Sequence, residues 1–104
     1  MKTKKIEREA LERMRSEGRD FYVVFTADWC GYCAALRREI DSAPSSFELF
    51  EFDISDEECP AWEDYEVKVV PTALYFKAGK EQTRKAASFT GLRVKDIEAL
   101  SSLR

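Results

Sequence analysis

Residues 21–33 have the sequence Phe21-Tyr22-Val23-Val24-Phe25-Thr26-Ala27-Asp28-Trp29-Cys30-Gly31-Tyr32-Cys33. The first half is a run of β-branched and aromatic residues without alternation, which is typical of a strand buried on both faces of a sheet. Two cysteines follow, and Leu36 and Ile40 continue from Cys33 at helical spacing. The stretch therefore predicts a strand that leads into a helix with two thiols at its start.

Two thiols at this spacing can close a small disulfide ring and reopen it. Because the N-terminus of a helix favours negative charge, we expect the Cys30 thiol to ionise more easily than a free cysteine. The thiolate is the nucleophile when thiols and disulfides exchange. The pattern predicts thiol–disulfide exchange at Cys30 and Cys33.

Hydrophobic spacing and turn residues divide the rest of the chain into further elements. In order, we expect an amphipathic helix at 4–17, a strand at 21–26, a helix at 31–41 stopped by Pro44, a strand at 47–54, a short helix opening at Ser55 and containing Pro60, a strand at 73–76, an exposed edge strand at 81–89 and a helix at 94–103.

This order predicts an α/β fold over residues 1–104 as one domain. The crossover through the cysteine-bearing helix makes the first two strands parallel, and the closing hairpin adds two antiparallel strands. We therefore expect a mixed four-stranded sheet with helices on both faces.

Composition excludes several classes of function. The 104 residues carry 17 Lys and Arg against 20 Asp and Glu, a net charge of −3, with the two signs interleaved. This argues against nucleic acid as the principal partner and gives no patch for an anionic membrane. No apolar segment follows the basic start, so we expect no signal peptide, no membrane span and a cytoplasmic location.

The chain has three cysteines and no histidine. A closed zinc site needs four such ligands, so we expect no metal and no cofactor within a single chain. The absence of histidine also removes the usual base of a Cys–His hydrolase. The third cysteine, Cys59, is interpreted as incidental.

Three motifs together resemble the thioredoxin-like superfamily. They are the stretch from Ala27 to Cys33, the Val70-Pro71-Thr72 segment before a strand, and the turn Phe76-Lys77-Ala78-Gly79. Tryptophan before the first cysteine resembles the thioredoxin branch, whereas the Cys-Gly-Tyr-Cys core is also one that glutaredoxins use. The similarity runs from about residue 19 to the C-terminus.

The resemblance implies a role for each matching residue. Cys30 would be the exposed nucleophile and Cys33 the buried resolving cysteine. Pro71 would be a cis-proline opposite the disulfide, with the Val70 backbone presented to an extended substrate. The expected substrate-binding residues are Trp29, Gly31, Tyr32, Val70, Pro71 and Gly91.

The chain also departs from the family pattern. Val24 stands where a classical thioredoxin carries a buried acid, so proton transfer from Cys33 would use water or another group. Tyr32 replaces the usual proline and Ala34 the usual lysine. The helix expected at 4–17 takes the place of the first thioredoxin strand, and the hairpin region 79–91 is longer than usual.

The leading interpretation is an enzyme that reduces protein disulfides and is itself regenerated by a thioredoxin-reductase-type or other dithiol reductant. We expect a monomer. A glutaredoxin-like activity with glutathione is an alternative, although no cationic set to clamp the glutathione carboxylates is evident. A non-enzymatic carrier of an iron–sulfur cluster or metal, held between two chains by the Cys-x-x-Cys motif, and a module that only docks to a partner also stay open.

Overall fold

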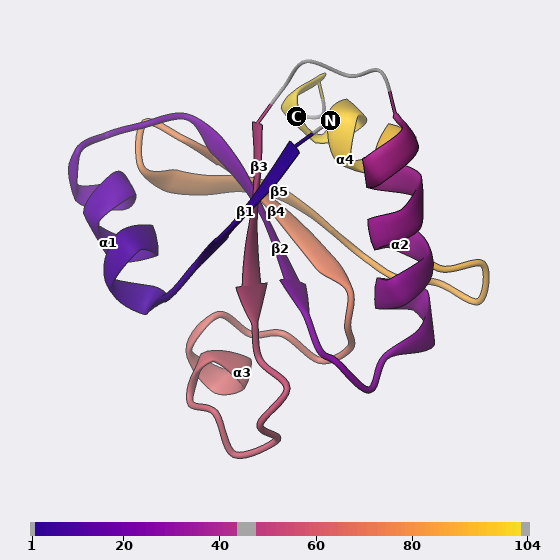
Figure 1. The fold of residues 1–104 in the computed structure, drawn as a ribbon. Helices are drawn as coiled ribbons and strands as arrows, with labels where there is room; N and C mark the ends of the chain where they lie inside the picture. The colour runs from indigo at the N-terminus through magenta and orange to yellow at the C-terminus, as the bar shows by residue number, and fades with distance from the viewer. Residues whose placement is uncertain (1, 44–47, 103–104) are drawn as a thin grey trace.

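A computed structural model describes residues 2–43 and 48–102. Five strands form one sheet in the order β1-β3-β2-β4-β5, and helices cover both of its faces (Figure 1). In chain order the elements are β1 (Lys2–Ile6), α1 (Arg8–Ser16), β2 (Phe21–Thr26), α2 (Gly31–Ser42), β3 (Glu48–Asp53), α3 (Ala61–Asp64), β4 (Thr72–Lys77), β5 (Lys80–Ala86), α4 (Val94–Ala99) and a 3₁₀ turn, η1 (Leu100–Ser102).

The central strand β2 organises the sheet. It pairs in parallel with β3, where Val23 lies opposite Phe50, and antiparallel with β4, where Val23 lies opposite Leu74. β1 extends the parallel side and β5 the antiparallel side. Because β2 has neighbours at both edges and helices over both faces, nearly all its side chains are buried, which explains the absence of alternation.

The α/β class, the mixed sheet and the helices on both faces are confirmed, but the strand count is wrong. Residues 2–6 form β1, a fifth strand, so no helix replaces the first thioredoxin strand. This edge strand is polar except for Ile6, and Ile6 lies at helical spacing from Ala10 and Leu11 in the sequence. A polar edge strand and the polar face of a helix look alike when the pairing partner, β3, is far along the chain.

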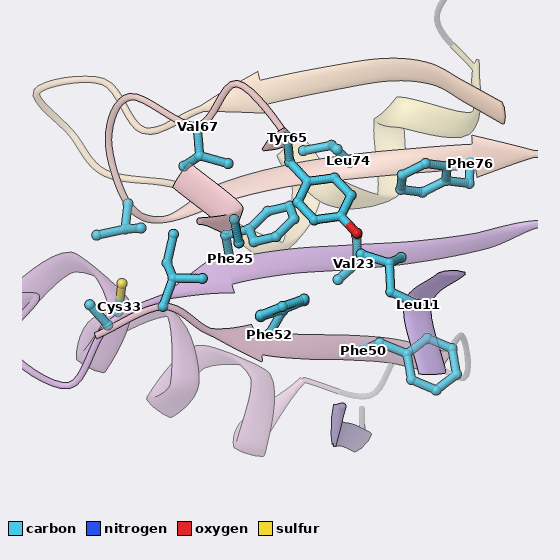
Figure 2. Packing of buried hydrophobic residues seen from close by; sticks show 14 of the residues in the cluster. Leu11, Val23, Phe25, Cys33, Phe50, Phe52, Tyr65, Val67, Leu74 and Phe76 are labelled. Carbon is cyan, nitrogen blue, oxygen red and sulfur yellow. The ribbon is translucent and has the colours of Figure 1, made fainter. Parts of the chain in front are cut away.

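Two apolar clusters lie on the two faces of the sheet. On one face, α1 and the α3 region contribute Leu11 and Tyr65 to a cluster with Phe25, Phe52 and other side chains of the strands (Figure 2). On the other, α2 and α4 bury their apolar side chains, which include Leu36, Ile40, Val94 and Ile97. The sheet is thereby held between two layers of helix.

Some boundaries also differ from expectation. The short helix α3 begins at Ala61 rather than near Ser55, because Ser55 and Asp56 form turns first, and Pro60 is its N-cap. β5 ends at Ala86, where a turn closed by the bridge between Ser88 and Gly91 begins. The expected stop at Pro44, the strand start at Phe47 and the last helical residue, Leu103, lie outside the described residues.

Candidate active site

The two predicted cysteines meet at the start of α2. Cys30 is the N-cap residue, and its sulfur accepts a hydrogen bond from the backbone N–H of Cys33 at 3.1 Å. Both are free thiols: Cys33 is buried with no exposed surface, and Cys30, which was expected to be exposed, is also buried, with 8% of its surface exposed, because the loop before β4 covers it. A donor aimed at the Cys30 sulfur would stabilise negative charge there, as at other helix N-termini.

Cys33 lies at the end of the apolar cluster under α3 (Figure 2). Its burial, helped by the hydrogen bond with Cys30, raises the pKa of its thiol to about 12, against smaller opposing effects of the Ala27 backbone and the Arg37 charge. The thiol is therefore protonated at neutral pH. An inward-facing thiol of this kind must lose its proton before it can act as a nucleophile.

The segment before β4 faces the dithiol. The Val70–Pro71 peptide bond is cis, and the Cys30 thiol donates to the Val70 carbonyl at 3.4 Å. The Thr72 hydroxyl donates to the Val69 carbonyl at 2.7 Å and closes this loop on itself. Residues 40 positions apart in the chain are thus in direct contact at the Cys30 sulfur.

Trp29 is half exposed beside Cys30, and its buried side is fixed by a hydrogen bond and a ring contact. Its indole N–H donates to the Ser55 carbonyl at 2.8 Å, and its ring stacks on Trp62 with an interplanar angle of 5°. The Trp62 indole N–H bonds the Ile54 carbonyl at 3.1 Å. Trp62 thereby supports an exposed aromatic surface next to Cys30.

Tyr32, which lies between the two cysteines in the sequence, packs against Gly91. Gly91 has φ +83°, and a Cβ there would approach the Tyr32 ring to 3.1 Å. The Tyr32 hydroxyl donates to the Phe89 carbonyl, so the turn after β5 is tied to the first turn of α2. Gly31, the first residue of α2, has open space where a side chain would begin.

In the described part of the chain, the exposed large apolar side chains lie on the segments just described: the loop before Cys30, the first turn of α2, the loop before β4 and the turn after β5. They are Trp29, Tyr32, Val69 and Phe89, and Phe89 is 96% exposed. We call them the apolar rim of the site. Val69 and Phe89 were not predicted as site residues, because a valine two residues before a proline and a phenylalanine in a presumed edge strand carry no functional signal in the sequence.

A buried acidic group does lie near the site, but not on β2. Val24 is directly opposite Glu51 of β3, and the Glu51 carboxylate, 3% exposed as a residue, accepts bonds from Thr26 at 2.6 Å and from Arg37 at 2.8 Å. The comparison with the family pattern predicted a missing acid at position 24 and gave no sign of this one on β3. The available signal was a charged residue inside the apolar run from Leu49 to Phe52.

Cys59 is half-buried in the turn before α3, on the α1 side of the sheet, and packs against the apolar cluster there. Within residues 2–43 and 48–102, no group of three or more Cys, Asp or Glu side chains is placed to hold a metal ion. None of the helices in these ranges has the length and apolar character needed to cross a bilayer.

The fold is α/β, with a mixed sheet between two layers of helix. A Cys-x-x-Cys dithiol lies at the start of a helix and faces a proline loop. This combination is that of the thiol–disulfide oxidoreductases. A family model for the thioredoxin-like domain matches residues 7–91, and the chain belongs to the thioredoxin-like family.

Known proteins agree with this assignment. The chain is 39% identical over 75 residues to a thioredoxin of Chlamydia caviae, covering 69% of each chain. It is 34% identical over 82 residues to a protein disulfide-isomerase candidate of Schizosaccharomyces pombe, of which it spans only 16%. The solved structure of Fasciola hepatica thioredoxin superposes with a TM-score of 0.70 at 26% identity, covering 100% of both chains.

Proposed function

We propose that this protein reduces disulfide bonds in other proteins, with Cys30 as the nucleophile and Cys33 as the resolving thiol. The observation that carries the proposal is the position of Cys30: its sulfur lies at the helix start, in contact with the Val70 carbonyl and with the Cys33 backbone N–H. Names of relatives, thioredoxin and protein disulfide-isomerase, point to the same chemistry.

Two exchange steps complete the reaction. The Cys30 thiolate attacks one sulfur of the substrate disulfide, a bond forms between them, and the other substrate sulfur leaves as a thiolate and takes up a proton. Cys33 then loses its proton and attacks Cys30, the mixed disulfide breaks, and the second substrate thiolate is protonated. The substrate gains two electrons and two protons, and the Cys30–Cys33 pair becomes a disulfide.

The apolar rim and the Val70–Pro71 loop would bind the substrate. An extended segment next to the substrate disulfide can lie along the Val70 backbone, while its side chains contact Trp29 and Tyr32. Neither Gly31 nor Gly91 carries a side chain that would keep the substrate backbone away from the Cys30 sulfur. The preferred substrate is therefore an exposed disulfide flanked by apolar residues.

A thioredoxin-reductase-type flavoprotein or another dithiol donor would return the Cys30–Cys33 disulfide to the dithiol. We propose that the protein acts in the cytoplasm as a monomer of one domain, where such reductants keep thiols reduced.

The test is insulin reduction with NADPH and a thioredoxin reductase, run beside turnover with glutathione and glutathione reductase. We expect the wild type and Cys59→Ser to reduce insulin, Cys30→Ser to be inactive, and no glutathione turnover. Turnover with glutathione alone would identify a glutaredoxin-like enzyme. A brown dimer after anaerobic purification, with no insulin reduction, would identify a metal or cluster carrier, and a colourless inactive protein a docking module.

A further inference from the structure

An ion pair between a partly exposed arginine and a buried carboxylate lies between α2 and the sheet, one helical turn from the resolving cysteine. Glu51 of β3 accepts two hydrogen bonds from the Arg37 guanidinium, at 3.0 and 2.8 Å, and one from the Thr26 hydroxyl at 2.6 Å. All three bonds end on the same carboxylate oxygen, so the guanidinium is held in one place. Arg37 is itself one-third exposed at its side chain, whereas Glu51 is 4% exposed.

The helix geometry directs Arg37 toward Cys33. Residues four apart on an α-helix are neighbours, with Cβ atoms about 6 Å apart, and side chains lean toward the helix N-terminus. Position 37 therefore lies on the same side of α2 as Cys33, one turn further along the helix. Its positive charge lowers the pKa of the Cys33 thiol, although burial, which raises it, dominates.

Stability alone is a weak reason for this arrangement. Taking two charges out of water costs free energy, and replacing such a pair with apolar side chains is often neutral or stabilising. Among the described residues, few other charged groups act on Cys33. The titratable and charged groups around Cys33 are Cys30 on its own helix and Arg37, and behind Arg37 β3 presents Glu51 and Asp53, with Lys5 of β1 acting on Asp53. The proline loop that faces the dithiol contributes Val70 and Pro71, which carry no charge.

We propose that Arg37, held in place by Glu51 and Thr26, supplies the positive charge that assists Cys33 when it attacks the mixed disulfide. Arg37 stabilises the Cys33 thiolate at the moment it forms, and Glu51 and Thr26 are positioning residues that act through Arg37. The inference rests on the proposed dithiol exchange, but only on its second step. Because Val24 replaces the family acid on β2, the Cys33 proton passes to water, and Arg37 stabilises the thiolate that remains.

The test isolates that second step from any protein substrate. Cys30 is converted to a mixed disulfide with 5,5′-dithiobis(2-nitrobenzoate) in a Cys59→Ser background, and the release of the second thionitrobenzoate by Cys33 is followed by stopped flow between pH 6 and 9. Because the Cys33 thiol titrates well above this range, both rates should rise with pH, and we expect Arg37→Gln to be slower than the wild type by about three- to tenfold throughout. Arg37→Lys keeps the charge and should stay near the wild-type rate.

A double variant separates charge from structure. Arg37→Gln with Glu51→Gln leaves no lone buried charge, so it should fold even where the single variant does not, and the slow release should persist. Glu39→Gln, which breaks the pair between Glu39 on the same helix and Arg93 at the start of α4, is the control and should release at the wild-type rate. A double variant that releases at the wild-type rate, or an Arg37→Lys variant as slow as Arg37→Gln, would overturn the proposal. This assay contains no protein substrate and no reductase, so its result does not depend on whether the protein reduces insulin.

Discussion

The two sulfurs of the site differ in what surrounds them. Cys30 is at the edge of the apolar rim and contacts the Val70 carbonyl, whereas Cys33 has no exposed surface. In the proposed reaction an incoming disulfide would therefore reach only the first sulfur, and the second would act from inside. Burial, which raises the pKa of Cys33, keeps it protonated until the mixed disulfide brings its target next to it.

Replacement of Cys33 by serine should stop the reaction at its midpoint. Cys30 can still attack, but a hydroxyl cannot displace it, so the mixed disulfide accumulates. Intact mass after incubation with a disulfide-containing peptide should show one peptide attached to Cys33→Ser and none to Cys30→Ser. Equal labelling of the two variants would mean that Cys59 reacts instead.

Phe89 is the most exposed side chain of the apolar rim, with 96% of its surface in water. Phe89→Ser should change the free energy of unfolding by less than about 0.5 kcal/mol, because nothing packs on the ring. Partial burial of this ring under a substrate is worth about 1.4 kcal/mol, so kcat/KM for insulin should fall by about tenfold. Small disulfide reagents should react as before, and Phe89→Tyr should keep the activity. An unchanged rate with insulin would remove Phe89 from the binding surface.

At the scale of elements, the turn between β4 and β5 is fixed on the end of α1. The Gly79 N–H donates to the Arg19 carbonyl at 3.0 Å, the Ala78 N–H bonds the Asp20 carboxylate at 2.7 Å, and Arg15 reaches back to the Gly79 carbonyl at 3.2 Å. This contact joins the hairpin to the helix layer on the opposite side of the sheet from α2.

Substitutions of two glycines allow backbone strain and steric conflict near this contact to be measured separately. Gly18 and Gly79 have φ +69° and +80°, but a Cβ at Gly18 meets nothing within 4 Å, whereas one at Gly79 would lie 2.0 Å from the Arg15 carbonyl oxygen. Gly18→Ala should cost about 1 kcal/mol for the left-handed conformation alone. Gly79→Ala should cost more than about 3 kcal/mol, because the turn must move off α1. Urea unfolding of both variants measures the difference, and equal losses would contradict the contact.

At the scale of the whole molecule, acid should destabilise the fold through carboxylates that are ion-paired or hydrogen-bonded. Burial alone would raise the pKa of Glu39, but the hydrogen bonds from Arg93 and the Val94 N–H outweigh it and lower the pKa. At Asp53 burial acts in the same raising direction and is outweighed by the Ser55 hydroxyl and N–H. A folded-state pKa below the unfolded one contributes stability above the unfolded value, and this stability is lost as the pH falls through the folded value.

We therefore expect the urea midpoint to be level near neutral pH and to fall from about pH 5 to pH 3. Glu39→Gln breaks the link between α2 and the start of α4, so it should cost about 1 kcal/mol at pH 7 and flatten part of the acid slope. A variant with the wild-type slope would show that Glu39 does not couple the two helices.

Much of the fold could be predicted because its signals are local. The apolar run of β2, the spacing of Leu36 and Ile40 in α2 and the turn at Gly79 each lie within a few residues. β1 was mistaken for helix because its pairing with β3 joins residues 46 positions apart, such as Lys4 and Phe50. In the site, Glu51 and Phe89 were missed for the same reason: one meets Arg37 across the helix–sheet interface, and the other meets Tyr32 through the turn after β5.

The sequence by itself determined the order of strands and helices from α1 onward and the neighbourhood of the two thiols, because a helix start brings residues three apart together whatever surrounds them. Only the tertiary structure decided which carbonyl faces Cys30, which cation stands behind Cys33 and which apolar side chains surround the nucleophile. These contacts join segments whose separation along the chain carries no periodic signal, and they exist only once the sheet has packed between its two layers of helix.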